Sequence, residues 1–280
     1  MENRILDIQN LSFYYKNLDL DSKSEKPWVN IFEDVSIEFD TGQIIGIVGK
    51  SGCGKTTLGK TIVNYHSLSG AYALNRDYKI NGNIHYYDAD SNLVDVMGKQ
   101  YTNIKPPPIQ MVFQDPRSSL NMKMKLIDQL KESIKLKFNL PKSELNERVY
   151  AIAKDFQIEN QLNSVPYNLS GGQRRRFGLA KIISSAPRLI IADEPVASLD
   201  VSIKRDIMNI LFNLKKQNIT IAVISHDIAL LQEKADYIFV FDKGKIVEKW
   251  NPKEAPKHSE TKKLLEDSNY VNEFVENIHV

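Results

Sequence analysis

The stretch GKSGCGKTT at residues 49–57 decides the fold, because it matches the phosphate-binding pattern G-x-x-x-x-G-K-[ST]. It follows an apolar run at residues 44–48, and the next segment, LGKTIVNY at 58–65, has the pattern of a helix. Strand, glycine-rich loop and helix N-terminus in this order aim backbone N–H groups at one anionic centre. The sequence therefore predicts an α/β fold that binds a nucleoside triphosphate.

The side chains of this loop have separate expected roles. Lys55 would neutralise β- and γ-phosphate oxygens, Thr56 would offer its hydroxyl to Mg2+, and Thr57 would lie near the α-phosphate. The other loop residues expected to bind nucleotide are Gly49, Ser51, Gly52, Cys53 and Gly54. A mere glycine turn is the alternative, and the surrounding strand and helix argue against it.

Composition excludes several classes of function. The 37 basic and 35 acidic residues nearly cancel to a net charge of +2, which gives no electrostatic footprint for nucleic acid. Cys53 is the only cysteine, so we expect no internal disulfide and no cysteine cluster; redox control of the loop is conceivable, and a small tolerated side chain is the simpler interpretation. No apolar run approaches the roughly 20 residues that cross a bilayer, and a secretory signal is missing, so we expect a soluble, cytoplasmic chain.

Hydrophobic patterning divides the chain into a β-rich beginning, a helical middle and a parallel sheet. Alternating residues predict strands at 6–15, 35–39 and 79–87, with a loop at 19–26 between the first two. Two amphipathic helices, containing Leu130 and Leu145, indicate a helical subdomain at about 115–185. Further expected elements are the strands IQMVF at 109–113, LIIAD at 189–193 and TIAVIS at 220–225, and a helix between the last two.

Asp193 and Glu194 end the LIIAD strand, at the sheet edge where open α/β folds bind ligands. Asp193 would hold Mg2+, directly or through water, and Glu194 could take a proton from an attacking water. The alternative is that the two acids only cap the following turn.

The segment LSGGQ at 169–173 lies between the phosphate loop and the IIADE strand, and this order resembles the nucleotide-binding subunit of ABC transporters. The resemblance covers about residues 4–249. It implies a P-loop NTPase of the ABC ATPase type, with a mainly parallel sheet, an N-terminal antiparallel β region and an inserted α-helical subdomain. The expected domain is residues 1–250, and a short C-terminal extension follows at 251–280.

Ser170 has the position of an N-cap on a helix that Gly171 and Gly172 open, which would make a second anion site in one chain. The resemblance implies a head-to-tail dimer, in which Ser170 and Gly172 of one protomer touch the γ-phosphate bound at Lys55 of the other. Gly171 and Gln173 belong to the same nucleotide-binding segment.

Other motifs of the resemblance fall on single residues. Gln114, in VFQDP, corresponds to the glutamine that senses the γ-phosphate, Mg2+ and attacking water, and His226, in ISHD, to the switch histidine. Tyr15 is the candidate to stack on adenine, although Tyr14 is adjacent and either could be an ordinary strand residue. SLD at 198–200 resembles the loop through which each subunit senses the other site. The arginines at 174–176 could clamp phosphate, and on an exposed helix they more often serve the surface.

Within the family, FQDPRSSLN at 113–121, DEPVASLDVS at 193–202 and PKHSETKKLL at 256–265 are similar to the oligopeptide, dipeptide and nickel importer group. Met122-Lys123, Ser259-Glu260 and Trp250 depart from that group's usual residues and weaken the inference of a substrate. The missing cysteine cluster argues against an iron–sulfur centre, and the short tail favours the nickel or metallophore branch.

The resemblance implies an Mg-ATP-hydrolysing importer subunit for oligopeptides, dipeptides or nickel and metal chelates. Its expected partners are a second ATPase of the same kind, typically a paralogue, two transmembrane permeases and an extracytoplasmic substrate-binding protein, with no nucleic acid. Permeases would hold it at the cytoplasmic face of the membrane. The alternatives are an ABC transporter ATPase for another cargo and a soluble ABC-type ATPase of translation or DNA maintenance. The second cassette or coiled-coil insertion usual in that soluble class is not found in this sequence.

Overall fold

A computed structural model describes residues 3–17, 28–68, 77–197 and 199–278, with backbone alone for 269–278. The loop expected at 19–26 lies outside these residues. Within them, no helix is both long enough and apolar enough to span a bilayer.

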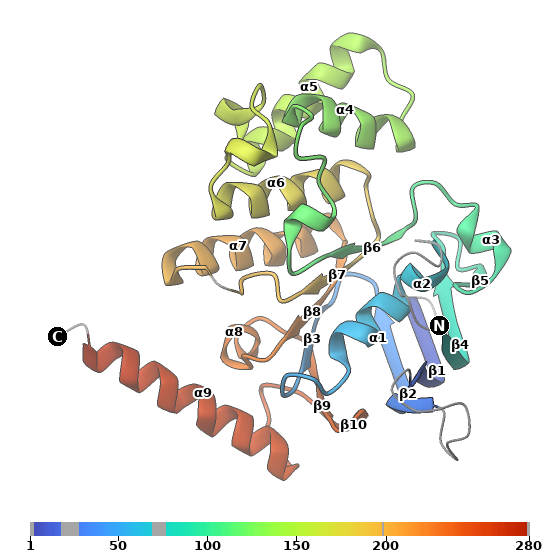
Figure 1. The fold of residues 1–280 in the computed structure, drawn as a ribbon, viewed down its shortest axis with the longest axis vertical. Helices are drawn as coiled ribbons and strands as arrows, with labels where there is room; N and C mark the ends of the chain where they lie inside the picture. The colour runs from blue at the N-terminus through green and yellow to red at the C-terminus, as the bar shows by residue number, and fades with distance from the viewer. Residues whose placement is uncertain (1–2, 18–27, 69–76, 198, 279–280) are drawn as a thin grey trace.

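A six-stranded sheet forms the centre of the molecule, in the order β10-β9-β3-β8-β7-β6 (Figure 1). All neighbouring pairs are parallel except the β9–β10 pair. Its strands are β3 Ile44–Val48, β6 Ile109–Val112, β7 Leu189–Asp193, β8 Thr220–Ser225, β9 Tyr237–Asp242 and β10 Lys245–Trp250. The predicted parallel sheet is confirmed, with the two predicted buried strands at their expected positions. The strands β9 and β10 were not predicted from the sequence.

A second sheet, of four antiparallel strands in the order β2-β1-β4-β5, contains the predicted N-terminal strands. Its strands are β1 Arg4–Lys16, β2 Trp28–Asp40, β4 Tyr78–Tyr87 and β5 Leu93–Asp95. Arg188 joins the two sheets, because its guanidinium donates to the Tyr86 hydroxyl at 3.2 Å and to the Tyr87 carbonyl at 3.0 Å.

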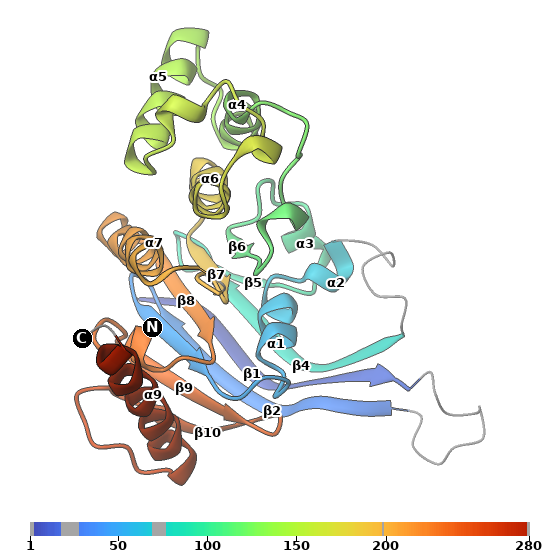
Figure 2. The same ribbon diagram turned by 60° about the vertical axis from the view of Figure 1, so that its left-hand side comes forward.

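Alternate residues of the parallel strands enter two different hydrophobic cores. In β3, Ile45 and Ile47 pack with the antiparallel sheet and with Leu58 of helix α1 (Lys55–Ile62). Ile44 and Val48 pack on the opposite side, with the helical subdomain. Period-two alternation in a strand covered on both faces produces this division. The phosphate loop therefore lies at the end of a strand buried between two layers (Figure 2).

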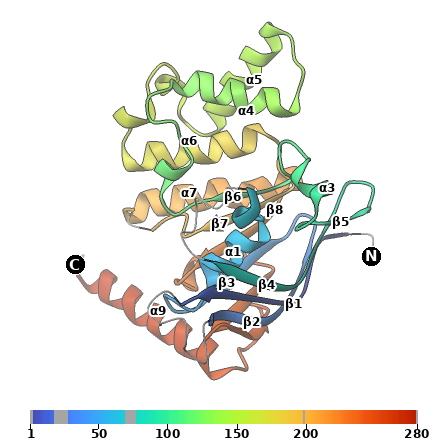
Figure 3. The same ribbon diagram turned by 45° about the vertical axis from the view of Figure 1, so that its right-hand side comes forward.

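The predicted helical subdomain contains three long helices, with α6 lying between the α4–α5 pair and α7 (Figure 1). The longer helices after α1 are α4 Leu126–Lys137, α5 Lys142–Asp155, α6 Gly171–Ser184, α7 Val201–Asn213 and α9 Ser259–Ile278. The short ones are α2 Tyr65–Leu68, α3 Lys99–Thr102, α8 Ala229–Gln232 and the 3-10 turns at 116–118, 159–161, 166–168 and 214–217. Helix α9 lies at the end of the molecule opposite α4 and α5 (Figure 3).

The helix expected at 58–65 begins and ends earlier than its apolar pattern indicated. It starts at Lys55, directly after the N-cap Gly54, and its backbone turn closes at Val63. Asn64, with φ of 53°, then separates it from α2. The consequence for the site is that Lys55, Thr56 and Thr57 form the first helical turn.

Candidate nucleotide-binding site

The phosphate loop has a backbone that requires glycine at two positions. A Cβ on Gly49 would collide with the Phe241 carbonyl of β9, and one on Gly54 would lie 2.9 Å from the Ile31 carbonyl of β2. Gly54 also has φ of 109°, which L side chains rarely adopt. Both strands therefore pack closely against the loop and fix its backbone conformation at the helix N-terminus.

Lys55 is 6% exposed, and its ammonium is held by the loop itself. Nζ donates to the carbonyls of Gly49 at 2.6 Å and Lys50 at 2.9 Å. The side chain thus folds back across the loop, where its positive charge and the α1 N-terminus would both attract an anionic ligand.

Thr56 and Asp193 bring two hard oxygen donors together, as an Mg2+ site requires. The Thr56 hydroxyl donates to Asp193 Oδ1 at 3.0 Å, and Asp193 is 2% exposed at the end of β7. Burial raises the pKa of Asp193, and the Thr56 hydroxyl offsets this in part. Among the described residues no group of three acidic, His or Cys side chains could hold a metal. The donors present fit Mg2+ bound by one or two side chains together with phosphate oxygens.

Glu194 and His226 form a second unit at the same sheet edge. Glu194 follows β7 in a left-handed conformation, with φ of 44°, and its N–H donates to the Ile224 carbonyl of β8 at 2.9 Å. Its Oε1 accepts the backbone N–H of His226 at 3.0 Å and lies 2.8 Å from His226 Nδ1. Backbone strain of this kind accumulates at functional sites, since surrounding contacts must maintain it.

One cavity, of about 450 Å³, brings most of the predicted residues together. Its lining contains six phosphate-loop residues and one residue from each of three other predicted segments. The members are Ser51, Gly52, Gly54, Lys55, Thr56, Thr57, Gln114, Glu194 and His226, with Ile31 of β2 in addition. Ile31 was not predicted; its place in a β-rich segment gave no signal, because contact with the loop depends on how the two sheets pack.

Gln114 is exposed in this cavity, directly after β6 and Phe113. Arg175 of α6 donates from its NH1 atom to the Phe113 carbonyl at 2.9 Å and is 4% exposed. Burial lowers the pKa of this guanidinium. The expectation that the arginines serve the surface is therefore wrong for Arg175, which ties the segment before Gln114 to the helical subdomain.

The LSGGQ segment forms the capped start of α6. Ser170 Oγ accepts the N–H of Gln173 at 3.2 Å, and the Gln173 side chain accepts the N–H of Ser170 at 2.9 Å. The predicted N-cap is confirmed as a reciprocal capping box. Gly171 is exposed and Gly172 lies against Ile203 of α7. None of these residues lines the cavity at Lys55 of the same chain.

Tyr15 is half-buried in β1, with its ring 4.7 Å from that of Phe13, and it is not among the cavity-lining residues. Its stacking on adenine stays a prediction. In the segment at 198–200, residue 198 lies outside the described residues, and Leu199 is close to Gly171.

Cys53 is partly buried in the loop, and its Sγ lies 3.7 Å from Lys55 Nζ. Burial raises the pKa of the thiol, and the neighbouring ammonium opposes that effect. A raised pKa disfavours the reactive thiolate, which supports the simpler interpretation of a tolerated small side chain.

Comparison with known proteins gives consistent matches. A family model described as ABC transporter matches residues 32–197. The chain is 32% identical over 272 residues to the oligopeptide transport ATP-binding protein OppF of Bacillus subtilis (strain 168), covering 95% of this chain and 82% of the relative. It is 32% identical over 258 residues to the dipeptide transport ATP-binding protein DppF of Lactococcus lactis subsp. cremoris (strain MG1363), covering 89% and 78%.

Solved structures show the same fold. The structure of cbiO1 from Clostridium perfringens, described as part of the ABC transporter complex cbiONQ, has a TM-score of 0.69 at 25% identity and covers 90% of each chain. A dimeric, post-hydrolysis structure of the ATP-binding cassette MJ0796 with ADP and Pi has a TM-score of 0.72 at 21% identity. That match covers 90% of this chain and 100% of the other.

Proposed function

The chain belongs to the ABC transporter family of ATP-binding proteins, and on that premise we propose that it is the ATP-hydrolysing subunit of a peptide importer. The observation that carries the proposal is the cavity shared by the phosphate loop, Gln114, Glu194 and His226. The relatives named for oligopeptide and dipeptide transport support peptides as the cargo. Nickel, favoured from the short tail, has no support among these names.

The geometry supports a division of labour in ATP hydrolysis. Lys55 and the first turn of α1 bind the β- and γ-phosphates, while Thr56 and Asp193 would hold the Mg2+ that offsets the phosphate charge. Both His226 contacts engage Oε1 of Glu194, so among the described contacts Oε2 is left to accept a proton from the attacking water. General-base catalysis of this kind contributes about 10²- to 10⁴-fold to the rate.

The proposed active unit is a head-to-tail pair of such subunits. Ser170, Gly172 and the α6 N-terminus make an anion-binding tip that does not line the cavity of their own chain. Placed against the Lys55 cavity of a second ATPase, paralogue or copy, this tip would complete the γ-phosphate site. ATP then stabilises only the closed pair, and its hydrolysis releases the pair.

The proposed partners beyond the ATPase pair are two permeases, which would hold the chain at the cytoplasmic membrane face, and an extracytoplasmic substrate-binding protein. The nearly balanced net charge gives no reason to expect nucleic acid as a partner.

The test is purification of the membrane complex with Glu194→Gln, identification of the associated chains, and reconstitution of the wild-type complex in vesicles. We expect two permeases, and ATP turnover that rises when peptide-loaded binding protein is added. Stimulation by nickel or a metal chelate instead would overturn the peptide assignment. Recovery of the chain with ribosomes or DNA, and without permeases, would favour the soluble class.

A further inference from the structure

Helix α9 contacts two segments beside the nucleotide cavity, the phosphate loop and the segment that follows β8. Its first turn reaches Lys50 of the phosphate loop, and Ser268, near its middle, reaches Asp227, the residue after His226. The helix belongs to the C-terminal extension, for which the proposed hydrolysis mechanism gives no role.

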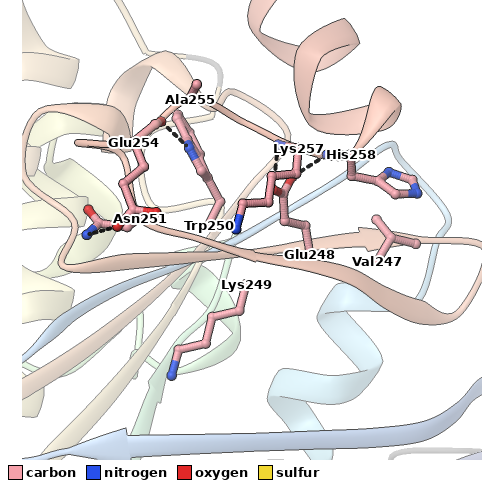
Figure 4. Close-up of a pocket in the computed structure, with 9 residues that line it drawn as sticks. All are labelled: Val247, Glu248, Lys249, Trp250, Asn251, Glu254, Ala255, Lys257 and His258. Atoms are coloured by element: carbon pink, nitrogen blue, oxygen red, sulfur yellow. Dashed lines mark hydrogen bonds between the residues drawn. The ribbon is translucent and has the colours of Figure 1, made fainter.

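The N-terminal end of α9 is anchored on β10. The Glu248 carboxylate accepts the N–H of Lys257 at 2.8 Å and of His258 at 3.1 Å (Figure 4). It also accepts the hydroxyl of Thr261. Thr261 is fully buried. Because β10 pairs with β9 and β9 with β3, this anchor sets the start of α9 relative to the strand that leads into the phosphate loop.

The first contact with the site is an ion pair. Lys50 Nζ lies 2.6 Å from Glu260 Oε1, with side-chain exposures of 50% and 16%. The Lys50 ammonium lowers the pKa of the Glu260 carboxyl. The carbonyl of the same Lys50 accepts from the ammonium of Lys55. Glu260 therefore holds a residue whose backbone positions the phosphate-binding lysine.

The second contact is a hydrogen bond to Asp227, the residue after His226. The Ser268 hydroxyl donates to Asp227 Oδ1 at 3.2 Å, and the same oxygen accepts the N–H of Ala229 at 3.0 Å. Asp227 is thus fixed between α9 and the start of α8, immediately after His226. His226 in turn contacts Glu194.

Between these two contacts α9 does not pack continuously on the loops. A cavity of about 360 Å³ separates them, lined by Ser51 and His226 on one side and by Leu264 and Asp267 on the other. Positioning by α9 therefore depends on the discrete contacts of Glu260 and Ser268, which single substitutions can remove.

We propose that Glu260 and Ser268 are positioning residues for ATP turnover, through which α9 fixes the phosphate loop and the switch histidine relative to one another. This inference rests on the proposed function, and it assigns the two contacts different effects. Loss of the Glu260 contact loosens the loop that binds phosphate and raises KM for ATP. Loss of the Ser268 contact loosens His226, and with it Glu194, and lowers kcat.

The variants are Glu260→Gln, Ser268→Ala and the control Lys262→Ala, which removes an exposed side chain of the same helix. For Glu260→Gln we expect KM for ATP to rise about two- to fivefold, as a partly exposed ion pair allows. For Ser268→Ala we expect kcat to fall about three- to tenfold with little change in KM. Ser268→Thr keeps the hydroxyl and should retain the wild-type kcat.

Amide hydrogen exchange of the same proteins, without nucleotide, separates this inference from the proposed function. We expect faster exchange at residues 49–54 in Glu260→Gln and at 225–229 in Ser268→Ala, with the control unchanged. If both variants showed wild-type exchange rates in both segments, the inference would be overturned, whether or not the chain hydrolyses ATP. The inference would also be overturned if the two variants lost kcat to the same extent and lost thermal stability to the same extent. In that case α9 would contribute only packing.

Discussion

The Glu194 carboxylate holds His226 by two contacts at once, with Oε1 3.0 Å from the backbone nitrogen and 2.8 Å from Nδ1 of the ring. An ionised carboxylate only accepts hydrogen bonds, so the ring proton resides on Nδ1 while Glu194 carries its charge. The two side chains come from adjacent strand ends, β7 and β8, and line the same cavity. Their pairing makes the proposed base and its orienting group one unit.

Replacing Glu194 by Gln removes the proton acceptor and keeps the shape of the side chain. We expect kcat to fall at least about 100-fold while ATP affinity is retained, and closed dimer to accumulate with ATP. Lys55→Ala should have the opposite effect, because it weakens ATP affinity itself. Steady-state turnover and equilibrium nucleotide binding measure both effects, and rapid hydrolysis by Glu194→Gln would exclude Glu194 as the base.

His226→Ala should lower kcat about 10- to 100-fold, because Glu194 loses its ring contact. Residues that act as a unit are not additive, so the double variant with Glu194→Gln should be little slower than Glu194→Gln alone. The measurement is a double-mutant cycle in kcat. Fully additive losses would show that the two residues act separately.

The elements that could be predicted from the sequence are those whose own residues carry a local pattern. The buried runs LIIAD and TIAVIS became β7 and β8, since a strand covered on both faces is apolar throughout. The hairpin of β9 and β10 was not predicted although YIFVF is apolar, because its turn at Lys243-Gly244 lacks the Asn-Gly or Asp-Gly pair that usually marks a two-residue turn with positive φ. Local chemistry also explains Ser170, whose capping box involves residues only three positions apart.

Three other contacts between distant segments could not be predicted from the sequence. Burial of Arg175 depends on the end of β6, 62 positions earlier in the chain. Ile31 enters the site because β2 packs against the phosphate loop, as its carbonyl beside Gly54 shows. The contact of Ser268 with Asp227 spans 41 positions and carries no local pattern at all.

Two helical glycines should respond oppositely to alanine. A Cβ on Gly59 of α1 would lie 2.7 Å from the Ile224 side chain, whereas one on Gly178 of α6 has its nearest neighbour at 3.8 Å. We expect Gly59→Ala to lower the free energy of unfolding by about 1 kcal/mol, since overpacking exceeds the gain in helix propensity. The matched control, Gly178→Ala, should raise it by about 0.5 kcal/mol. Urea denaturation measures both, and a stabilising Gly59→Ala would contradict the tight packing of α1 on the sheet.

His66 gives the fold a pH dependence. Burial lowers the pKa of its imidazole from 6.5 to about 4. Between these values the unfolded chain binds more protons, so the free energy of unfolding decreases as pH falls through this window. We expect the His66 contribution to be about 1–2 kcal/mol after solvent screening.

His66→Phe, beside the Phe13 and Tyr78 rings, should flatten that dependence. Denaturant titrations at several pH values measure the slope. Above about pH 7 the variant and the wild type should differ by a constant amount. An unchanged slope in the variant would assign the effect to other groups.

The proposed γ-phosphate site, completed by a second subunit, is tested most directly by ATP turnover of Ser170→Arg and wild type over a wide range of protein concentration. Ser170 does not line the cavity of its own chain, so a site completed by a second subunit predicts two results. Turnover per wild-type molecule should fall on dilution. The Ser170→Arg variant should lose turnover although each of its chains still binds ATP. Concentration-independent turnover by monomers, unaffected by Ser170→Arg, would contradict the account.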